Sequence, residues 1–289
     1  MSAGKEIRSK IKSVQNTQKI TRAMQMVATS KMRKTQEKMN GARPYAENIR
    51  RVMANLASLG MYTRNATSFL RKPIEVKSVG IILITTDKGL CGGLNTNTLK
   101  LFYDKLYSLQ KSEVSVEICS IGHKGLNVIN RLGLNVCGSV VALGDVPRMD
   151  KLVGPLSGLL NKFYNGGIDE VYVIYSQFIN TMKQQSTCEK LLPIADVVLS
   201  VEYGARDYLY EPDATLVLEG LIRRYIESVV YQCVAENMAS EQAARMVAMK
   251  SATDNAGNAI NQLNLVYNKS RQATITKELA EIVAGSSAV

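Results

Sequence analysis

The sequence of 289 residues contains no tryptophan and only 6% aromatic residues, so sites built from stacked aromatic rings are not expected. A single histidine, His123, excludes metal sites and hydrolytic mechanisms that need two imidazole groups. The five cysteines are odd in number and form no CxxC pair, which predicts free thiols in a reducing compartment. The longest strongly apolar run, residues 79–84, is far shorter than the roughly 20 residues of a membrane-spanning helix, so we expect a soluble chain.

Positive charge is concentrated at the start of the chain. Residues 1–72 hold 16 of the 36 lysines and arginines but only 3 of the 25 acidic residues, which gives this segment a formal charge of +13 and the remainder −2. Such a segment can bind nucleic acid, lie on a membrane surface or face an acidic protein. A solvated helix face would need no partner, but the scarcity of acidic residues favours an acidic surface opposite it.

A heptad track runs through the first fifty residues. Alternating steps of four and three lead from Ile7 to Leu56 without interruption, which predicts one long helix with a coiled-coil seam. We expect Gly41 and Pro44 to bend this helix without ending it, because no turn residues surround them. The polar middle of the track is too weak for a self-pairing zipper and favours a partner with small residues. The track consists of Ile7, Ile11, Val14, Gln18, Thr21, Gln25, Ala28, Met32, Thr35, Met39, Ala42, Ala46, Ile49, Met53 and Leu56.

A second seam lies at the other end of the chain. No proline follows Pro212, and helix-forming residues dominate from Asp213, which is suited to the N-cap, to about Val283. A helix of about 70 residues is about 105 Å long at ~1.5 Å per residue, too long to be buried in its own small domain. The second seam consists of Met246, Met249, Thr253, Ala256, Ile260, Leu263 and Tyr267.

Between the two helical ends, strands alternate with helices, which indicates a mostly parallel sheet. We predict strands at 79–86, 114–121, 134–143, 170–179 and 187–194, and helices at 95–109, 124–132 and 149–164. The predicted fold class is therefore α/β: a long antiparallel coiled coil of the N- and C-terminal helices with an inserted Rossmann-like α/β domain. Residues 1–60 with 210–289 are assigned to a discontinuous coiled-coil shaft, and residues 74–200 to the inserted domain.

The segment GLCGGLN, Gly89–Asn95, joins the first strand to a helix. Glycines at such a junction can build a phosphate or dinucleotide site, because backbone amides and the helix dipole favour anions there. The spacing is GxxGG rather than GxGxxG, and no Walker lysine follows, so a tight turn with positive φ is the favoured interpretation. Cys91 lies within this turn without an identifiable base beside it, so a nucleophilic role has little support.

The remaining polar residues do not assemble an active site. His123 follows a strand in an expected loop and is assigned no role, and the acidic residues of the α/β segment show no spacing typical of an acid/base pair. An enzyme using the glycine turn for a nucleotide and a basic coiled-coil DNA-binding protein stay open as alternatives. In the second class a compact basic region precedes a leucine-rich zipper, whereas here the basic residues interleave with the seam.

Four segments together resemble the gamma subunit of the F-type ATP synthase, in the same order along the chain. They are KEIRSKIKSVQNTQKITRAMQMVATSKMRK, TTDKGLCGGLN, ARMVAMKSATDNA and ITKELAEIVAG. The last resembles a closing family pattern at Ile275, Thr276, Glu278, Glu281 and Gly285, and the chain has Ser286 where family members usually carry alanine. The resemblance implies a bacterial member of the family.

The resemblance also implies a function and partners. The paired terminal helices would enter a ring of three alpha and three beta subunits, and the α/β domain would lie at the foot of the shaft, beside the epsilon subunit and a membrane ring of c subunits. The delta subunit would belong to the same catalytic sector. The chain would be a non-catalytic rotor of proton-driven ATP synthesis and hydrolysis, with no catalytic residue, cofactor, metal or nucleic acid, peripheral on the cytoplasmic face of the bacterial inner membrane.

Ten residues match family positions that contact other subunits. The basic residues near the start and Met24 would face moving beta-subunit elements, Arg245 and Gln272 would act similarly on the C-terminal helix, and the last three would occupy an apolar bearing. The ten are Lys19, Arg22, Met24, Lys31, Arg33, Arg245, Gln272, Leu279, Ile282 and Val283.

Overall fold

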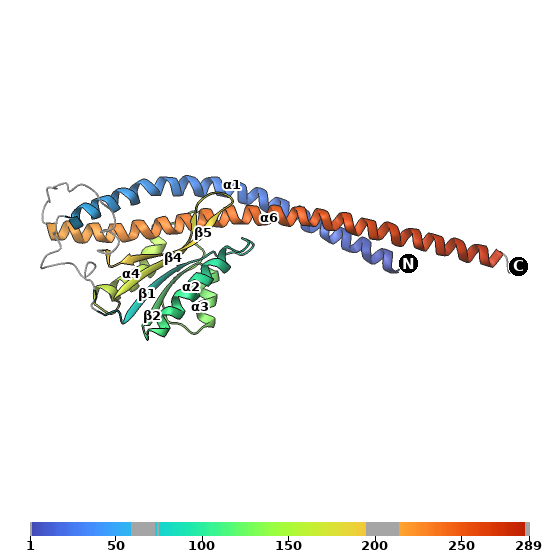
Figure 1. Ribbon diagram of the computed structural model, residues 1–289. Coiled ribbons are helices and arrows are strands. Elements are labelled where there is room, and N and C mark those ends of the chain that lie inside the picture. Colours follow the sequence, from blue (N-terminus) through green and yellow to red (C-terminus); the bar gives the residue numbers. More distant parts are fainter. Residues whose placement is uncertain (1, 59–72, 74, 195–213, 287–289) are drawn as a thin grey trace. The chain divides into compact units, whose positions relative to one another are not determined.

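A computed structural model describes residues 2–58, 73, 75–194 and 214–286 (Figure 1). The chain divides into two compact units, of which one comprises Met1–Thr29 with Arg245–Val289 and the other Ser30–Ala244. No helix within the described ranges is long and apolar enough to cross a membrane. The elements are α1 (Ser2–Ser58), β1 (Ser78–Ile84), α2 (Leu94–Lys111), β2 (Ser115–Ile121), α3 (His123–Arg131), β3 (Val136–Val140), α4 (Met149–Tyr164), β4 (Glu170–Phe178), β5 (Gln184–Leu192) and α6 (Ala214–Ser286).

The larger unit is built on one five-stranded sheet with the order β3-β2-β1-β4-β5. The first four strands in this order pair in parallel, and β5 pairs antiparallel with β4 as an edge strand. The predicted, mostly parallel α/β sheet is therefore confirmed. The last strand begins earlier than predicted, because Gln184 pairs with Phe178 across the β4–β5 hairpin.

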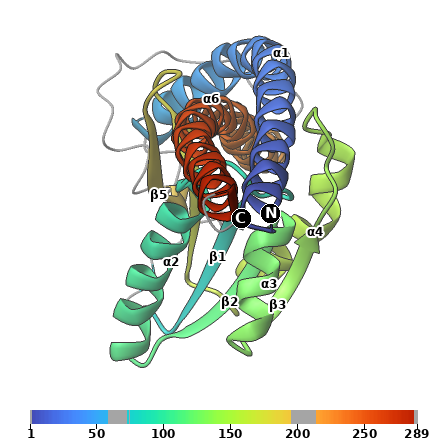
Figure 2. The same ribbon diagram turned by 90° about the vertical axis from the view of Figure 1, so that its right-hand side faces the viewer.

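Helices cover both faces of this sheet, as Figure 2 shows. Successive side chains of a strand point to opposite faces, so Ile81 and Leu83 pack against α2 and α3, whereas Ile82 and Ile84 face a second core. That second core contains residues of α4, of α6 up to Met238, and Ile49 of α1. Within this unit, α1 and α6 thus lie on the sheet face opposite α2 and α3.

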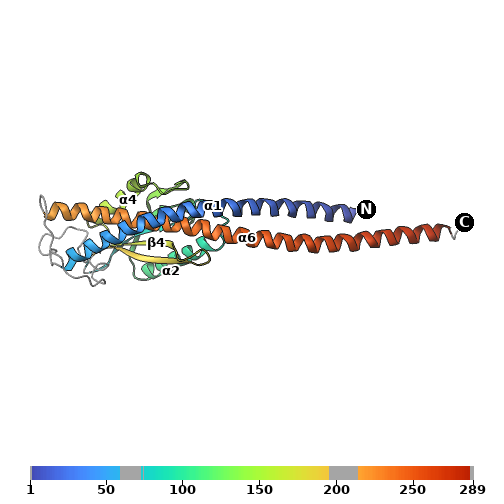
Figure 3. The same ribbon diagram turned by 90° about the horizontal axis from the view of Figure 1, so that it is seen from above.

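The smaller unit consists of the beginning of α1 and the end of α6, which run side by side (Figure 3). Both predicted seams are confirmed. Every described side chain of the first track, from Ile7 to Ile49, is buried or half-buried, and so are the seven side chains of the second seam, of which Met246 is the first and Tyr267 the last. Helix α1 continues through Pro44, as predicted. The side chains of Met53 and Leu56 and the expected N-cap Asp213 lie outside what the structure describes.

Candidate partner-contact surface

Two helices of the smaller unit pair in antiparallel orientation. Gly4 of α1 lies against Tyr267 of α6, whereas Gln18, further along α1, donates a hydrogen bond to the carbonyl oxygen of Thr253 (3.3 Å). The partner's number falls as the number on α1 rises, which defines the antiparallel direction. The hydroxyl oxygens of Thr21 and Thr253 lie 2.8 Å apart in a second hydrogen bond. The polar middle of the seam is therefore held by directional bonds rather than by apolar packing alone.

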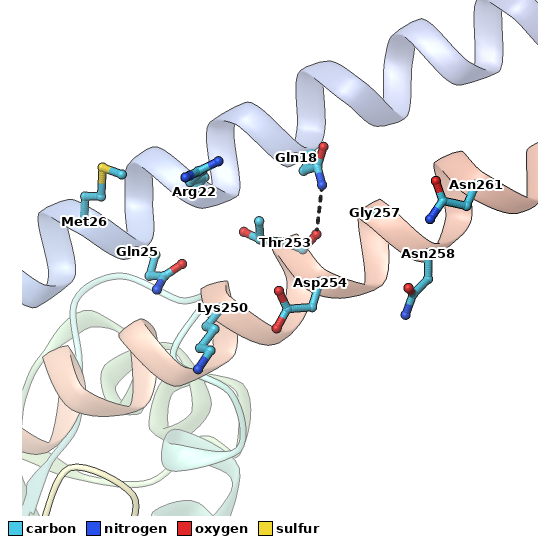
Figure 4. A pocket seen from close by; sticks show the side chains of 10 residues that line it. All are labelled: Gln18, Arg22, Gln25, Met26, Lys250, Thr253, Asp254, Gly257, Asn258 and Asn261. Carbon is cyan, nitrogen blue, oxygen red and sulfur yellow. Dashed lines mark hydrogen bonds between the residues drawn. The ribbon is translucent and has the colours of Figure 1, made fainter. Parts of the chain in front are cut away.

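A groove of about 590 Å³ opens beside these bonds (Figure 4). Its floor is narrow, because a β-carbon added at Gly257 would come within 3.1 Å of the Gln18 amide nitrogen. Arg22 of α1 and Lys250 and Asp254 of α6 line the groove and give it charges of both signs. The groove can receive a polar or acidic side chain. Among the described residues, no group of three or more His, Cys, Asp or Glu is placed to hold a metal ion.

The predicted contact residues of the smaller unit differ in exposure. Lys19 and Arg22 are exposed and form no ion pair with any described residue, and Arg22 also lines the groove. Met24 is half-buried, and Gln272 is exposed. Arg245 is only 8% exposed, so little of its side chain is accessible to another chain. The structure does not test the roles of these residues, and they stay predictions.

The C-terminal end of α6 is exposed over its last four described turns. Every residue from 271 to 284 is exposed, including Leu279 (57%), Ile282 (67%) and Val283 (65%). Large apolar side chains that remain in water on a helix end favour burial against another surface. The prediction of an apolar bearing contact at these residues is compatible with their exposure and is not tested by it.

The two remaining predicted residues, Lys31 and Arg33, lie in the larger unit. Lys31 Nζ forms an ion pair of 2.6 Å with Asp145 Oδ1 in the segment between β3 and α4. Arg33 is exposed and has no ion-pair partner among the described residues. The Lys31–Asp145 pair could not be predicted from the sequence, because the two residues are 114 positions apart.

The outer face of α1 carries an exposed apolar strip that is absent from the predicted contact residues. Ile20 (59% exposed) and Val27 (54%) lie outside the heptad track and point away from the seam, whereas Met26 (61%) lines the groove beside the seam. The spacing of Ile20 and Val27, two helical turns apart, was the available signal, because residues seven apart share a helix face. Ile20 and Val27 thus give the outer face of α1 exposed apolar area.

The glycine turn is a tight connection, as the favoured interpretation predicted. Gly92 has a φ of 59° and Leu90 a φ of 63°, both in the left-handed region.

His123, expected in a loop, is instead the first residue of α3. Its backbone N–H and that of Leu143 donate to the two carboxylate oxygens of Asp87, at 3.1 and 3.2 Å.

The carboxyl edge of the sheet, where a nucleotide binds in related folds, is closed by the chain itself. The backbone N–H of Gly125 in α3 donates to Thr85 Oγ1 (2.8 Å). Like the N–H of His123, this amide at the start of α3 is therefore already hydrogen-bonded within the chain. A cavity of about 20 Å³ remains there, lined in part by Asn237 and Glu241 of α6. Ligand pockets are usually about 300 Å³ or larger, so this cavity offers no room for a nucleotide.

This arrangement defines a class of protein: an antiparallel pair formed by the two chain ends, with an α/β sheet in the middle of the sequence. The family model described as ATP synthase matches residues 3–289, and the chain belongs to that family. The ATP synthase gamma chains of Chromobacterium violaceum and Laribacter hongkongensis are 59% and 57% identical to it, each over the full length of both chains. The chain is thus a homologue of bacterial gamma chains.

Solved structures agree with this assignment. The chain is similar to one from the central stalk and c-ring of the Tetrahymena thermophila mitochondrial ATP synthase, with a TM-score of 0.59 and 26% identity over 81% of this chain and 99% of that one. A chain of the Euglena gracilis mitochondrial ATP synthase rotor has a TM-score of 0.62 and 19% identity, over 95% of this chain and 99% of that one. The second likeness supports the fold alone.

Proposed function

We propose that this chain is the central rotor shaft of a bacterial proton-translocating F-type ATP synthase. It couples rotation of a membrane ring to sequential conformational change in the catalytic beta subunits. The observation that carries the proposal is the 59% identity over the full length of a bacterial gamma chain, which includes both paired helices and the sheet. The likeness to a central-stalk chain supports the same role.

In this role the chain performs no catalysis. ATP is made and hydrolysed on the beta subunits, and the shaft contributes only the surface that it presents to each of them in turn. A partner shifts a conformational equilibrium only by the difference between its affinities for the two states. Reversing a site from 1:99 to 99:1 takes about 5.5 kcal/mol, whereas one exposed ion pair supplies about 0–1 kcal/mol. The coupling therefore requires many contacts that change together.

The exposed residues of the helix pair are suited to such contacts. Lys19, Arg22 and Arg33 present positive charge without a described ion-pair partner, which favours acidic elements on the beta subunits. The strip of Ile20 and Val27 adds exposed apolar area on α1. At the other end, exposed Leu279 and Ile282 are suited to an apolar collar formed by the alpha and beta subunits.

The proposed partners are three alpha and three beta subunits around the helix pair, the epsilon and delta subunits of the same sector, and the ring of c subunits. The complex is membrane-associated, and the chain is peripheral on the cytoplasmic face of the bacterial inner membrane. In this scheme residues 1–60 with 210–289 form the shaft, and residues 74–200 form the inserted domain at its foot.

Co-expression with the alpha and beta subunits encoded in the same genome tests the proposal. A tag on this chain should recover one copy of it with three copies of each partner, as measured by native mass spectrometry. With the beta subunits fixed to a surface, a probe on α2 should rotate in one direction when ATP is supplied. Recovery of the chain alone, or a probe that does not turn in an assembled complex, would contradict the proposal.

A nucleotide-binding control separates this function from the enzyme alternative. Equilibrium dialysis of the full chain with NAD and with ATP should show no tight binding, because the cavity at the carboxyl edge of the sheet is about 20 Å³. Tight binding of either nucleotide by the chain alone would favour the enzyme alternative.

A further inference from the structure

Helix α6 bonds directly to the backbone of β4 beyond the point where β1 stops pairing with it. The pairing of β1 with β4 ends at Ile174, whereas β4 continues to Phe178. At Ser176 the backbone N–H donates to Asn237 Oδ1 (3.2 Å), and the backbone carbonyl accepts from Ser240 Oγ (3.0 Å). Two side chains of a helix thus satisfy the backbone groups of a sheet strand.

These bonds are deeply buried and lie on one helix face. Ser176 is 1% exposed, Asn237 2% and Ser240 0%. Residues three apart share a face of a helix, so both side chains reach the same strand residue. An unpaired backbone group at this depth is costly, so loss of either bond is unfavourable. The two bonds therefore hold α6 in one rotational setting on the sheet.

The other contacts of α6 with the sheet side are mainly apolar. Ile222, Ile226 and Val230 belong to the core shared with β1 and β4. Hydrophobic burial is non-directional, so it resists separation of the helix from the sheet more strongly than it resists rotation of the helix about its own axis. Interlocked side chains also resist such a rotation, and directional bonds located away from that axis add to this resistance.

Polar contacts also tie α1 to the same assembly within the larger unit. The Glu236 side chain is buried on α6, its Oε1 lies 3.6 Å from Arg43 Nη2, and it accepts a hydrogen bond from Gln232 (3.1 Å). Arg50 of α1 lies 3.9 Å from Glu189 of β5. The Arg43–Glu236 pair joins α1 to α6 and the Arg50–Glu189 pair joins α1 to β5, and at 3.6 and 3.9 Å both are longer than the two bonds to Ser176.

We propose that Asn237 and Ser240 are positioning residues that fix the rotational setting of α6 on the sheet and carry torque between them. The inference rests on the proposed function, in which the sheet and the helices turn as one rotor. A torque applied to the sheet tends to turn α6 about its axis. The paired bonds to Ser176 oppose this movement, because they hold both the donor and the acceptor of one buried peptide segment.

The test measures the torsional stiffness of the rotor in the complete complex. A cysteine at position 107, where the native tyrosine of α2 is 72% exposed, carries the probe, and the beta subunits are fixed to a surface. The angular spread of the probe is recorded while the motor is paused. If the two bonds were the only restraint and equally stiff, removing one would double the mean-square spread; because packing also restrains α6, we expect an increase of at most about twofold for Ser240→Ala and for Asn237→Leu.

Two controls distinguish torque transmission from general destabilisation. Ser240→Thr keeps the hydroxyl group and should increase the spread less than Ser240→Ala does, although its added methyl group must fit a fully buried site. Ser228→Ala removes the hydroxyl of a buried serine on the same helix that bonds to no described strand, and it should leave the spread unchanged. ATP hydrolysis without load should stay within about twofold of the unmodified complex in all variants, because none of these residues lies in the proposed contact set.

The outcomes separate this inference from the proposed function. An unchanged spread in both Ser240→Ala and Asn237→Leu, even with a lower unfolding temperature, overturns the inference and leaves the rotor role intact. Failure of the unmodified complex to rotate overturns the proposed function, and the inference falls with it. If Asn237→Leu does not assemble, Ser240→Ala decides alone, because it removes one oxygen atom and keeps the helix packing.

Discussion

Gly257 of α6 lies against the side chain of Gln18 of α1: a β-carbon at residue 257 would come within 3.1 Å of the Gln18 amide nitrogen. We expect Gly257→Leu to destabilise the chain by about 1–3 kcal/mol, because the larger side chain displaces Gln18 and breaks its bond to Thr253. Urea unfolding of the full chain, followed by far-UV circular dichroism, measures the effect.

Gly41 provides a matched control for this substitution. It also lies inside a helix, but no atom lies within 4 Å of a β-carbon added there. Gly41→Leu should therefore stabilise the chain by up to about 1 kcal/mol through helix propensity alone. Stabilisation by both substitutions would show that the contact at Gly257 is easily relieved and would contradict the prediction.

The Lys31–Asp145 ion pair should contribute little to stability. Its side chains are 36% and 61% exposed, so water screens their attraction despite the separation of 2.6 Å. A double-mutant cycle with Lys31→Ala and Asp145→Ala should give a coupling energy below about 1 kcal/mol, falling toward zero near 1 M salt. A coupling above about 2 kcal/mol that persists in salt would show that this exposed pair fixes the position of α1.

The buried thiol of Cys119 should make the chain sensitive to alkali. Burial raises the pKa of this thiol from its usual 9.0 to about 12. Below pH 9 both the folded and the unfolded chain keep the proton, and the contribution to stability is complete. Between pH 9 and about 12 only the unfolded chain releases the proton, so stability falls as pH rises, by about 1.4 kcal/mol per pH unit for this group.

Comparison with variants isolates the contribution of this thiol from those of other groups that titrate at high pH. Cys119→Ala should reduce the slope of unfolding free energy against pH by the equivalent of one proton above pH 9. Ser120→Ala, at a neighbouring residue that is also fully buried, removes no titratable group and should shift stability by the same amount at every pH, leaving the slope unchanged. Equal slopes in all three chains would show that the thiol is not held neutral by the fold.

Much of the fold could be predicted from periodicity because local pattern and tertiary burial agree. Helix α4 has the predicted bounds, Met149–Tyr164, since its apolar residues repeat at helical spacing. Strand β5 was placed less accurately, because its sequence QQSTCEKLL alternates weakly and its start is decided by pairing with β4. Strand β3 is shorter than predicted, ending at Val140 two residues before Ala142, whose φ is 56°.

The candidate site could be predicted only in part, because its geometry depends on residues far apart in the sequence. The polar middle of the seam indicated a special region, but the approach of Gly257 to Gln18 depends on the register between two helices more than 200 residues apart. The bonds from Asn237 and Ser240 to β4 leave no trace in periodicity, since polar residues on a helix usually face water. The proposed contacts with other subunits require surfaces that this sequence does not contain.

The exposed apolar tip of α6 should affect coupling more than folding. Leu279 is 57% exposed, so Leu279→Asp removes little packing within the chain, and its unfolding temperature should stay within about 2 °C of the native value. In the assembled complex, a charge placed in an apolar collar is costly, and ATP-driven proton pumping by membrane vesicles should fall several-fold relative to ATP hydrolysis. Removal of residues 280–289 should have the same effect.

Ala280→Asp is the matched control, because it adds the same charge at the neighbouring exposed position without removing a large apolar group. We expect it to reduce the ratio of pumping to hydrolysis less than Leu279→Asp does, since residue 280 is turned about 100° away around the helix axis. Equal losses in the two variants would mean that added charge, rather than the apolar contact of Leu279, disturbs the complex. Unfolding of the α/β sheet on removal of residues 280–289 would contradict the assignment of this segment to contacts with other chains.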